Sequence, residues 1–164
     1  IDWNVTADAP TDVVDQAILQ LEDRIQQTNA HIQLDFESDF QLISIKPYLA
    51  SIMYNLISNG IKYRHPDRDP QIRIAVKTVD HQAIISVSDN GIGIDMDKYS
   101  QQLFSLYKRF HEHVEGKGMG LYLVKVQVEN MGGKISVNSA INKGTTFHVC
   151  LEQEVSTVSS LLNI

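Results

Sequence analysis

The amino-acid sequence predicts an α+β fold, a two-layer α/β sandwich in which helices cover one face of a mixed, mostly antiparallel sheet. Short stretches with apolar residues at every second position alternate with longer stretches in which apolar residues recur every three or four positions. Two pairs of the predicted strands are joined by turns of only two or three residues, which connect antiparallel neighbours. Because long helices stand between the other strands, the order of elements favours helices packed on one sheet.

The first half of the chain is predicted to contain two helices and three strands. Val14, Ile18 and Leu21 recur at helical spacing after a capping and proline signal at Asp8-Ala9-Pro10, which predicts a single helix over 11–29. The other elements predicted for this half are strands over 32–36, 42–45 and 72–76, and a helix over 46–63.

The second half of the chain begins with a predicted hairpin turn at Asp80-His81, which leads into a strand over 83–87. Helical spacing from Leu121 to Met131 predicts another helix, which Gly132-Gly133 ends. The last elements are predicted strands over 135–137 and 147–151, joined by a turn over 142–144. We expect one domain over residues 1–151, followed by a C-terminal tail over 152–164.

Composition excludes several classes of protein. The 14 Lys and Arg against 20 Asp and Glu give a formal charge of −6, so we expect neither nucleic-acid binding nor direct membrane contact. A single cysteine, Cys150, excludes a disulfide framework, and no apolar run is long enough to span a membrane. The chain begins at Ile1 rather than at a methionine, so we expect it to be a fragment of a longer protein.

A polar stripe marks the helix predicted over 46–63. Asn55, Asn59 and Lys62 fall within one narrow sector of it, opposite the apolar face. Amide oxygens are hard ligands for Mg²⁺, and a lysine ammonium is a point charge for phosphate oxygens. An ordinary solvated face explains the stripe as well, and it is the commoner reason for one.

Asp89 continues the inward phase of the strand over 83–87 and therefore points toward the core at the end of that strand. A buried carboxylate is costly unless it accepts hydrogen bonds, and a nucleobase amino group is one such donor. The alternative is that Asn90-Gly91 forms a plain hairpin turn and Asp89 belongs to it. The residues alone leave both readings open.

Eight of the nine glycines lie between Gly91 and Gly144, which makes this stretch the first place to look for a binding site. The run from Gly116 to Gly120 stands directly before a predicted helix, where backbone N–H groups can cradle an anion. Its spacing fits neither a P-loop nor a dinucleotide fingerprint, so on its own it is a weak signal.

Taken together, the motifs resemble the ATP-binding catalytic domain of sensor histidine kinases, within the GHKL ATPase superfamily. The order is N-x-x-x-N-x-x-K-Y, D-x-G-x-G, a Phe-rich segment, G-x-G-x-G and Gly-Thr-Thr, and the match covers roughly residues 4–151. The resemblance implies the Bergerat-type ATP-binding fold, with ATP and Mg²⁺ as cofactors. It also implies a nucleotide lid over residues 94–118.

The resemblance further implies a role for each matched residue. Asn59 would ligate Mg²⁺ with Asn55 alongside, Lys62 would meet phosphate, Tyr63 would lie against adenine, and Asp89 would accept the adenine amino hydrogen. Asn55, Lys62 and Arg109 would be the catalytic residues, with Arg109 reaching the terminal phosphate. The remaining nucleotide contacts would come from Gly91, Gly93, Ile94, Lys108, Gly116, Lys117, Gly118, Gly120, Leu121, Thr145 and Thr146.

The implied activity is that of a protein histidine kinase, which transfers the γ-phosphoryl group of ATP to a histidine on a separate dimerisation domain. Hydrolytic relatives carry a glutamate at the position of Asn55, and an amide cannot take a proton from water, whereas a neutral imidazole already offers a lone pair. None of the six histidines resembles the phosphoacceptor motif of the family. The expected partners are therefore the histidine-bearing dimerisation domain of the same protein and a downstream response regulator, in the cytoplasm.

Two other functions fit the same motifs. The first is a nucleotide-sensing module without catalysis, in which ATP orders the lid to create a surface for a partner protein. The second is an interaction domain that has lost ATP, which leaves the inward phase of Asp89 without a reason. Gly60 departs from the family pattern, which usually has alanine there, and glycine weakens a helix by up to about 1 kcal/mol.

Overall fold

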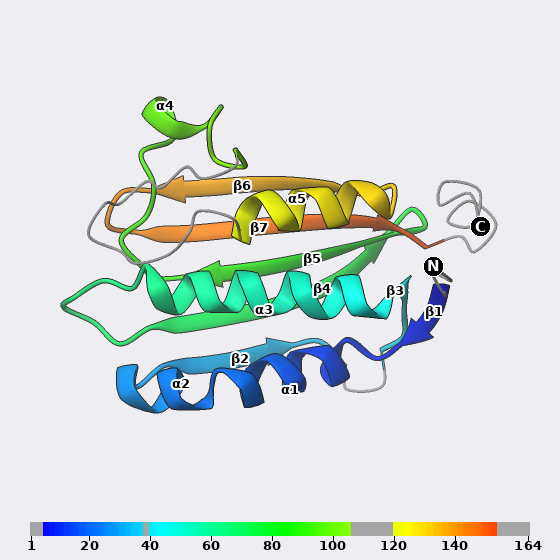
Figure 1. The fold of residues 1–164 in the computed structure, drawn as a ribbon, viewed down its shortest axis with the longest axis horizontal. Helices are drawn as coiled ribbons and strands as arrows, with labels where there is room; N and C mark the ends of the chain where they lie inside the picture. Colours follow the sequence, from blue (N-terminus) through cyan, green and yellow to red (C-terminus); the bar gives the residue numbers. More distant parts are fainter. Residues whose placement is uncertain (1–4, 38–39, 106–119, 154–164) are drawn as a thin grey trace.

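The computed structural model describes residues 5–37, 40–105 and 120–153, and all structural statements concern this part of the chain. Its main feature is a five-stranded sheet (Figure 1). Every neighbouring pair in the sheet is antiparallel except β2 and β4, which are parallel. This confirms the predicted mixed, mostly antiparallel sheet. The strands, in their order across the sheet, are β2 (His31–Asp35), β4 (Gln71–Val79), β5 (Gln82–Asp89), β7 (Gly144–Glu152) and β6 (Lys134–Ala140).

Helices cover one face of this sheet, as Figure 1 shows. α3 lies at the centre and contacts β4 and β5, with α1 and α2 on one side of it and α5 on the other. Buried aliphatic side chains from both layers form one core, so the two-layer sandwich is also confirmed. The helices are α1 (Pro10–Gln20), α2 (Glu22–Thr28), α3 (Lys46–Lys62) and α5 (Gly120–Asn130).

α3 positions the polar stripe that the sequence predicted. Pro47 lies in its first turn, where a missing N–H costs nothing, and its apolar residues face the sheet. Gly60 lies where the helix approaches β4: a Cβ atom at this position would be 2.9 Å from Cδ1 of Ile72. The glycine therefore weakens the helix locally but allows the isoleucine to fill the space between helix and sheet.

The prediction of one helix over 11–29 is wrong. The chain breaks the helix at Leu21 (φ −101°, ψ 9°), and α1 and α2 lie on either side of this residue. The Leu21 side chain is fully buried, and both short helices contact α3. The break thus changes the direction of the chain, and both α1 and α2 contact α3.

Two elements were not predicted from the sequence. β1 (Val5–Asp8) pairs with β3 (Leu42–Ile45) in a separate two-stranded antiparallel sheet, so the strand predicted over 42–45 is confirmed but lies outside the main sheet. The short helix α4 (Met96–Tyr99) follows Asp95, whose side chain accepts a hydrogen bond from the backbone N–H of Lys98. Both elements are too short to give a periodic pattern.

Both predicted hairpin turns are present. Asp80 and His81 join β4 to β5 with φ of 49° and 64°, the two positive values that a type I′ turn requires. Asn142 (φ 65°) lies in the turn between β6 and β7, and Gly144 (φ 122°) is the first residue of β7. β7 runs to Glu152, one residue into the expected tail.

None of the described helices is both long and apolar enough to cross a membrane.

Candidate functional site

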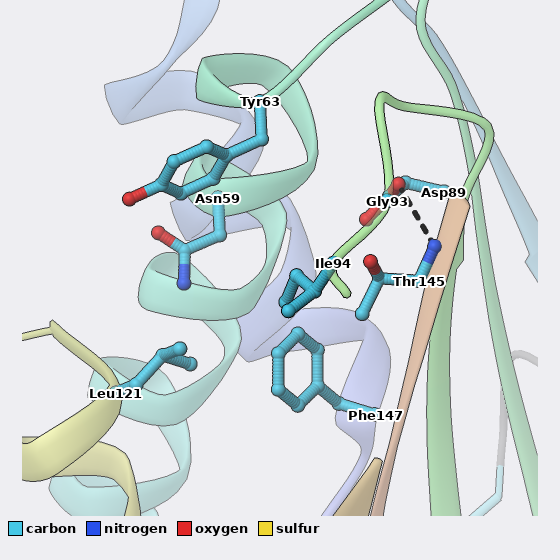
Figure 2. Close-up of a pocket in the computed structure, with 8 residues that line it drawn as sticks. All are labelled: Asn59, Tyr63, Asp89, Gly93, Ile94, Leu121, Thr145 and Phe147. Atoms are coloured by element: carbon cyan, nitrogen blue, oxygen red, sulfur yellow. Dashed lines mark hydrogen bonds between the residues drawn. The ribbon is translucent and has the colours of Figure 1, made fainter. Parts of the chain in front are cut away.

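A pocket lies between the end of α3 and the sheet, where β5 ends and β7 begins (Figure 2). Its wall combines one carboxylate, one carboxamide and two hydroxyl-bearing side chains, Tyr63 and Thr145, with apolar surface. The lining residues are Asn59, Tyr63, Asp89, Gly93, Ile94, Leu121, Thr145 and Phe147.

Among the described residues of this wall Asp89 is the only carboxylate, and it points inward as its phase predicted. Its Oδ1 accepts two hydrogen bonds, from the backbone N–H of Gly91 at 2.9 Å and from that of Thr145 at 3.2 Å. Burial raises the pKa of Asp89 to about 6, although the two backbone hydrogen bonds act in the opposite direction. Within the described residues nothing donates a hydrogen bond to Oδ2, so this oxygen is available to a ligand.

The apolar part of the pocket has the shape of a slot. Figure 2 shows Ile94 and Phe147 on one side and Leu121 on the other, with the Tyr63 ring above. Phe147 packs edge-to-face against Phe104, with ring centroids 6.4 Å apart and planes at 68°. A flat aromatic ligand can lie in this slot and, with an amino group at its edge, donate a hydrogen bond to Oδ2 of Asp89.

The loop after β5 carries two glycines that the pocket requires. Gly93 has φ of +75°, and a Cβ atom there would lie 2.0 Å from the carbonyl oxygen of Ala140. At Gly91, a Cβ atom would lie 2.4 Å from the carbonyl oxygen of Tyr63. The loop therefore packs backbone against backbone on both sides, and no side chain fits at either position.

The polar stripe of α3 runs from the pocket toward the start of α5. Asn59 lines the pocket. Asn55 donates a hydrogen bond from Nδ2 to the carbonyl oxygen of Ser51 at 2.8 Å, and its Oδ1 faces Gly120 at the first residue of α5. The amide nitrogen of Asn55 thus points back along α3, and its oxygen points toward the start of α5. Two carboxamide oxygens on adjacent turns suit a hard cation that keeps part of its coordination on phosphate.

Lys62 lies one turn beyond Asn59 at the end of α3. Burial lowers its pKa, and the nearby positive charge of Arg24 lowers it further. Arg24 itself reaches α3 from α2 and donates a hydrogen bond to Oγ of Ser58 at 3.3 Å. Two cationic groups therefore lie at this end of the stripe, which gives a favourable electrostatic environment for an anion.

Among the predicted site residues that the structure describes, those that line the pocket are Asn59, Tyr63, Asp89, Gly93, Ile94, Leu121 and Thr145. Asn55, Lys62, Gly91, Gly120 and Thr146 are not part of that lining. Thr146 lies on the opposite face of the sheet, where its Oγ1 donates a hydrogen bond to Oγ of Ser88 at 2.9 Å. Its predicted place in the pocket is wrong, because alternate residues of a strand point to opposite faces and Thr145 takes the inward position. Five predicted residues lie outside the described part of the chain: Lys108, Arg109, Gly116, Lys117 and Gly118.

Two residues of the site were missed in the sequence. Phe147 shares the inward phase of Thr145, so the alternation of the last strand was a sufficient signal for it. Ser139 on β6 accepts a hydrogen bond from the backbone N–H of Ile94 at 2.8 Å and lies 2.8 Å from Oγ1 of Thr145. No local pattern indicates Ser139, because its partners are distant in the sequence.

Solved structures with the same fold are histidine kinase catalytic domains. The mycobacterial sensor histidine kinase MprB is 22% identical with a TM-score of 0.76, over 91% of this chain and 97% of that one. A nucleotide-free form of the catalytic domain of histidine kinase ThkA is 19% identical with a TM-score of 0.77, over 92% and 96% of the two chains. At these identities the agreement establishes the fold.

Sequence comparison establishes the family. Residues 45–155 match the family of histidine kinase-, DNA gyrase B- and HSP90-like ATPases. Cyanobacterial phytochrome A of Nostoc sp. is 36% identical over 137 residues, which cover 82% of this chain and 17% of that protein. Phytochrome-like protein Cph1 of Synechocystis sp. is 33% identical over 139 residues, which cover 84% and 18%. The chain belongs to this ATPase family, as an ATP-binding catalytic domain of the sensor histidine kinase type, and spans less than a fifth of the length of these two relatives.

Proposed function

We propose that the pocket binds the adenine of Mg²⁺-ATP and that the chain catalyses transfer of the γ-phosphoryl group from ATP to a histidine on a separate dimerisation domain, with ADP as the leaving group. The observation that carries the proposal is Asp89: one carboxylate oxygen is held by two backbone N–H groups while the other faces an apolar slot. Adenine is flat and presents an amino group at its edge. A ligand of this kind replaces the water that the buried carboxylate otherwise needs.

The same geometry predicts that the pocket prefers adenine to guanine. The exocyclic amino group of adenine donates to Oδ2 of Asp89, whereas guanine presents a carbonyl oxygen at that position and repels it. A site built around one hydrogen bond strongly rejects the analogue that lacks it. Tyr63, Ile94 and Phe147 supply the apolar contacts to the ring.

The triphosphate extends along the polar stripe of α3 toward the start of α5. Asn55 and Asn59 would hold Mg²⁺ through their amide oxygens, and the metal when bound neutralises phosphate charge. Lys62 attracts the phosphates by its charge. By the family resemblance, Lys108, Arg109 and the glycine run 116–120 complete the phosphate site, with Arg109 on the terminal phosphate.

Asn55 favours transfer to histidine over hydrolysis. Its amide nitrogen is already bonded to the Ser51 carbonyl oxygen, and an amide does not remove a proton from water at neutral pH. A neutral imidazole needs no such base, because one ring nitrogen carries a free lone pair. Positioning and charge neutralisation are then the main tasks of the protein.

The partners of this reaction are proposed with it. The phosphoacceptor histidine lies on the dimerisation domain of the same protein, and a response regulator receives the phosphoryl group in the cytoplasm. The solved full-length ShkA, 18% identical with a TM-score of 0.76, is complexed with AMPPNP, and the domain with this fold forms 31% of that chain. This supports a chain that works as one part of a longer kinase.

The proposal is tested by incubating the chain with γ-labelled ATP and Mg²⁺, alone and with the segment of the parent protein that carries the phosphoacceptor histidine. We expect acid-labile label on that segment only, and none with Asp89→Asn. Arg109→Ala should slow the transfer more than it weakens ATP binding, because its charge matters most as the terminal phosphate departs. Rapid phosphate release by the chain alone indicates a self-sufficient ATPase instead. Tight ATP binding without any transfer indicates the nucleotide-sensing module.

A further inference from the structure

Arg68 joins two loops that form the end of the pocket. It lies in the connection between α3 and β4, five residues after Tyr63. Its Nε donates a hydrogen bond to the carbonyl oxygen of Asn90 at 2.7 Å. Its Nη2 donates to the carbonyl oxygens of Gly91 at 3.1 Å and Asn142 at 2.6 Å. One guanidinium therefore binds three backbone carbonyls, two in the loop after β5 and one in the turn before β7.

These two loops carry the groups that we assign to adenine. The loop after β5 begins at Asp89, and the turn before β7 leads into Thr145, whose N–H bonds to Asp89. The loops also touch directly, because the backbone N–H of Asn142 donates to the carbonyl oxygen of Ile92 at 2.8 Å. Arg68 thus links the residues that follow Asp89 to the turn that precedes Thr145.

Asn90 ties the same loop to the connection that carries Arg68. Its Oδ1 accepts a hydrogen bond from the backbone N–H of Gln71 at 2.8 Å, and its Nδ2 donates to the carbonyl oxygen of Asp69 at 3.0 Å. The backbone N–H of Ile92 donates to the carbonyl oxygen of Tyr63 at 2.9 Å. The loop after β5 is therefore bonded on one side to the α3–β4 connection, and Arg68 extends this bonding to the β6–β7 turn.

We infer that Arg68 is a positioning residue for base recognition: it sets the adenine selectivity of the pocket without touching the nucleotide. The inference rests on the proposed function, in which Asp89 reads the adenine amino group. A guanidinium offers several donors in a fixed planar fork, which suits three carbonyls at a junction, whereas a lysine ammonium is a single point on a flexible chain. The three carbonyls belong to two loops that are otherwise joined to each other by the hydrogen bond between Asn142 N–H and the Ile92 carbonyl oxygen, so Arg68 adds three further bonds at this junction.

Arg68 is exposed and stands outside the hydrophobic core. Its truncation therefore removes donors without leaving a cavity, and the fold can be retained while the loops lose their common partner. The expected effect is on the position of Asp89 and on the amides at the junction. It is not expected on Asn59 or Lys62, which lie on α3 and are held by the helix.

The test compares Arg68→Ala and Arg68→Lys with Arg73→Ala in the full 164-residue chain. Arg73 is a matched control, because it is an exposed arginine on β4 whose bond goes to the Asp35 side chain on β2. Calorimetry measures the dissociation constants of ADP and GDP for each variant. We expect Arg68→Ala to weaken ADP binding about tenfold, equivalent to about 1.4 kcal/mol, and to narrow the preference for ADP over GDP. Arg68→Lys should recover part of the loss, and Arg73→Ala should match the wild type.

Hydrogen exchange of the nucleotide-free chain gives a second measurement that does not depend on binding. In Arg68→Ala the amides of Gly91, Ile92 and Thr145 should exchange faster, while those in the centre of α3 are unchanged. Unchanged exchange at these amides overturns the inference, and so does an ADP-to-GDP preference equal to that of the wild type. If the wild-type chain itself shows no preference for ADP, the proposed role of Asp89 fails. The exchange measurement then still decides whether Arg68 holds the loops.

Discussion

The backbone N–H of Thr145 donates a hydrogen bond of 3.2 Å to Oδ1 of Asp89, and so ties the start of β7 to the end of β5. Oδ1 also accepts the N–H of Gly91, so both protein donors use one oxygen of the carboxylate. The division of roles between the two oxygens makes the consequences of replacing this side chain specific. An asparagine can keep the two backbone hydrogen bonds through its Oδ1 but presents an NH₂ group where Oδ2 was.

Asp89→Asn should therefore lose adenine binding although the loop geometry is retained. The new NH₂ group meets the amino group of adenine, donor against donor, so we expect binding of ADP to fall about 100-fold, a loss of about 3 kcal/mol. Calorimetry with ADP and GDP measures this. Thr146→Ala is the control, because its side chain lies on the far face of the sheet and should leave both constants unchanged. Wild-type binding by Asp89→Asn is incompatible with the assigned role.

The pH dependence of stability should also change at Asp89. Its pKa is raised from 3.8 to about 6 in the folded, nucleotide-free chain, so the folded state holds the proton more tightly than the unfolded state does. The stabilising contribution of this proton is complete below about pH 4 and is lost as the pH rises through about 6. The free energy of unfolding of Asp89→Asn should thus exceed that of the wild type by about 1–3 kcal/mol at pH 7.5.

Urea unfolding of both proteins between pH 4 and 8 checks this prediction. The difference between Asp89→Asn and the wild type should grow between pH 4 and 6 and be constant above that range. A constant difference across the whole range means that the carboxylate is not destabilised by burial.

Asn59→Ala should remove the enhancement of ATP binding by Mg²⁺. The side chain lines the pocket at the phosphate side, and we assign its amide oxygen to the metal. Titrations of ATP with Mg²⁺ and with EDTA should differ for the wild type and agree for the variant. Asn138→Ala is a suitable control, because that amide lies on the outer face of the sheet beside His148. Equal ATP affinity with and without Mg²⁺ in the wild type contradicts the metal site.

Gly60 and Ile72 should be coupled in a double-mutant cycle. Gly60→Ala gains helix propensity, about 1 kcal/mol, but its methyl group meets Cδ1 of Ile72 at 2.9 Å. Ile72→Val removes that methyl group and alone costs about 0.5–1.5 kcal/mol. We expect the free energy of unfolding of the double variant to exceed the value obtained by adding the two single changes by about 0.5–1 kcal/mol, as measured by urea unfolding. Strict additivity shows that the two side chains do not compete for the same space.

Nucleotide binding should slow hydrogen exchange after Ile94 more than before it. The N–H groups of Ile92 and Ile94 are already bonded, to the Tyr63 carbonyl oxygen and to Oγ of Ser139. Their exchange should be slow without a ligand. In the stretch 95–105 of the predicted lid the bonded N–H groups, such as that of Tyr99 to the Asp95 carbonyl oxygen, have partners within the same stretch, so we expect this stretch to gain protection when an ATP analogue binds. Equal protection of 95–105 with and without the analogue contradicts the lid.

The sequence was sufficient for the parts of the fold that repeat a periodic pattern. Asp80-His81 marked its hairpin, and the inward phase of β5 correctly oriented Asp89. Periodicity failed where the tertiary structure acts against it. The spacing of apolar residues continues through Leu21, but the helix ends at this residue, whose side chain is buried in the core.

The candidate site was predictable from motifs but its bonding was not. The sequence alone does not distinguish Thr145 from Thr146, and only the strand register shows which one faces the pocket. Arg68 occupies a polar loop, where an exposed arginine is ordinary, and its three acceptors become visible only when two distant turns meet. Such contacts are set by the assembled sheet, which no local pattern encodes.

The pocket lies at the pairing of β5 with β7, and this has a consequence for folding. β4 pairs with β5, and β6 with β7, through local hairpins, but Asp89 and Thr145 are 56 residues apart in the chain. Closing the β5–β7 pairing carries a large entropic cost and joins the two hairpins into one sheet. The nucleotide site therefore exists only in the completed domain. Nucleotide binding raises the free energy of unfolding of the whole domain and does not stabilise one loop alone.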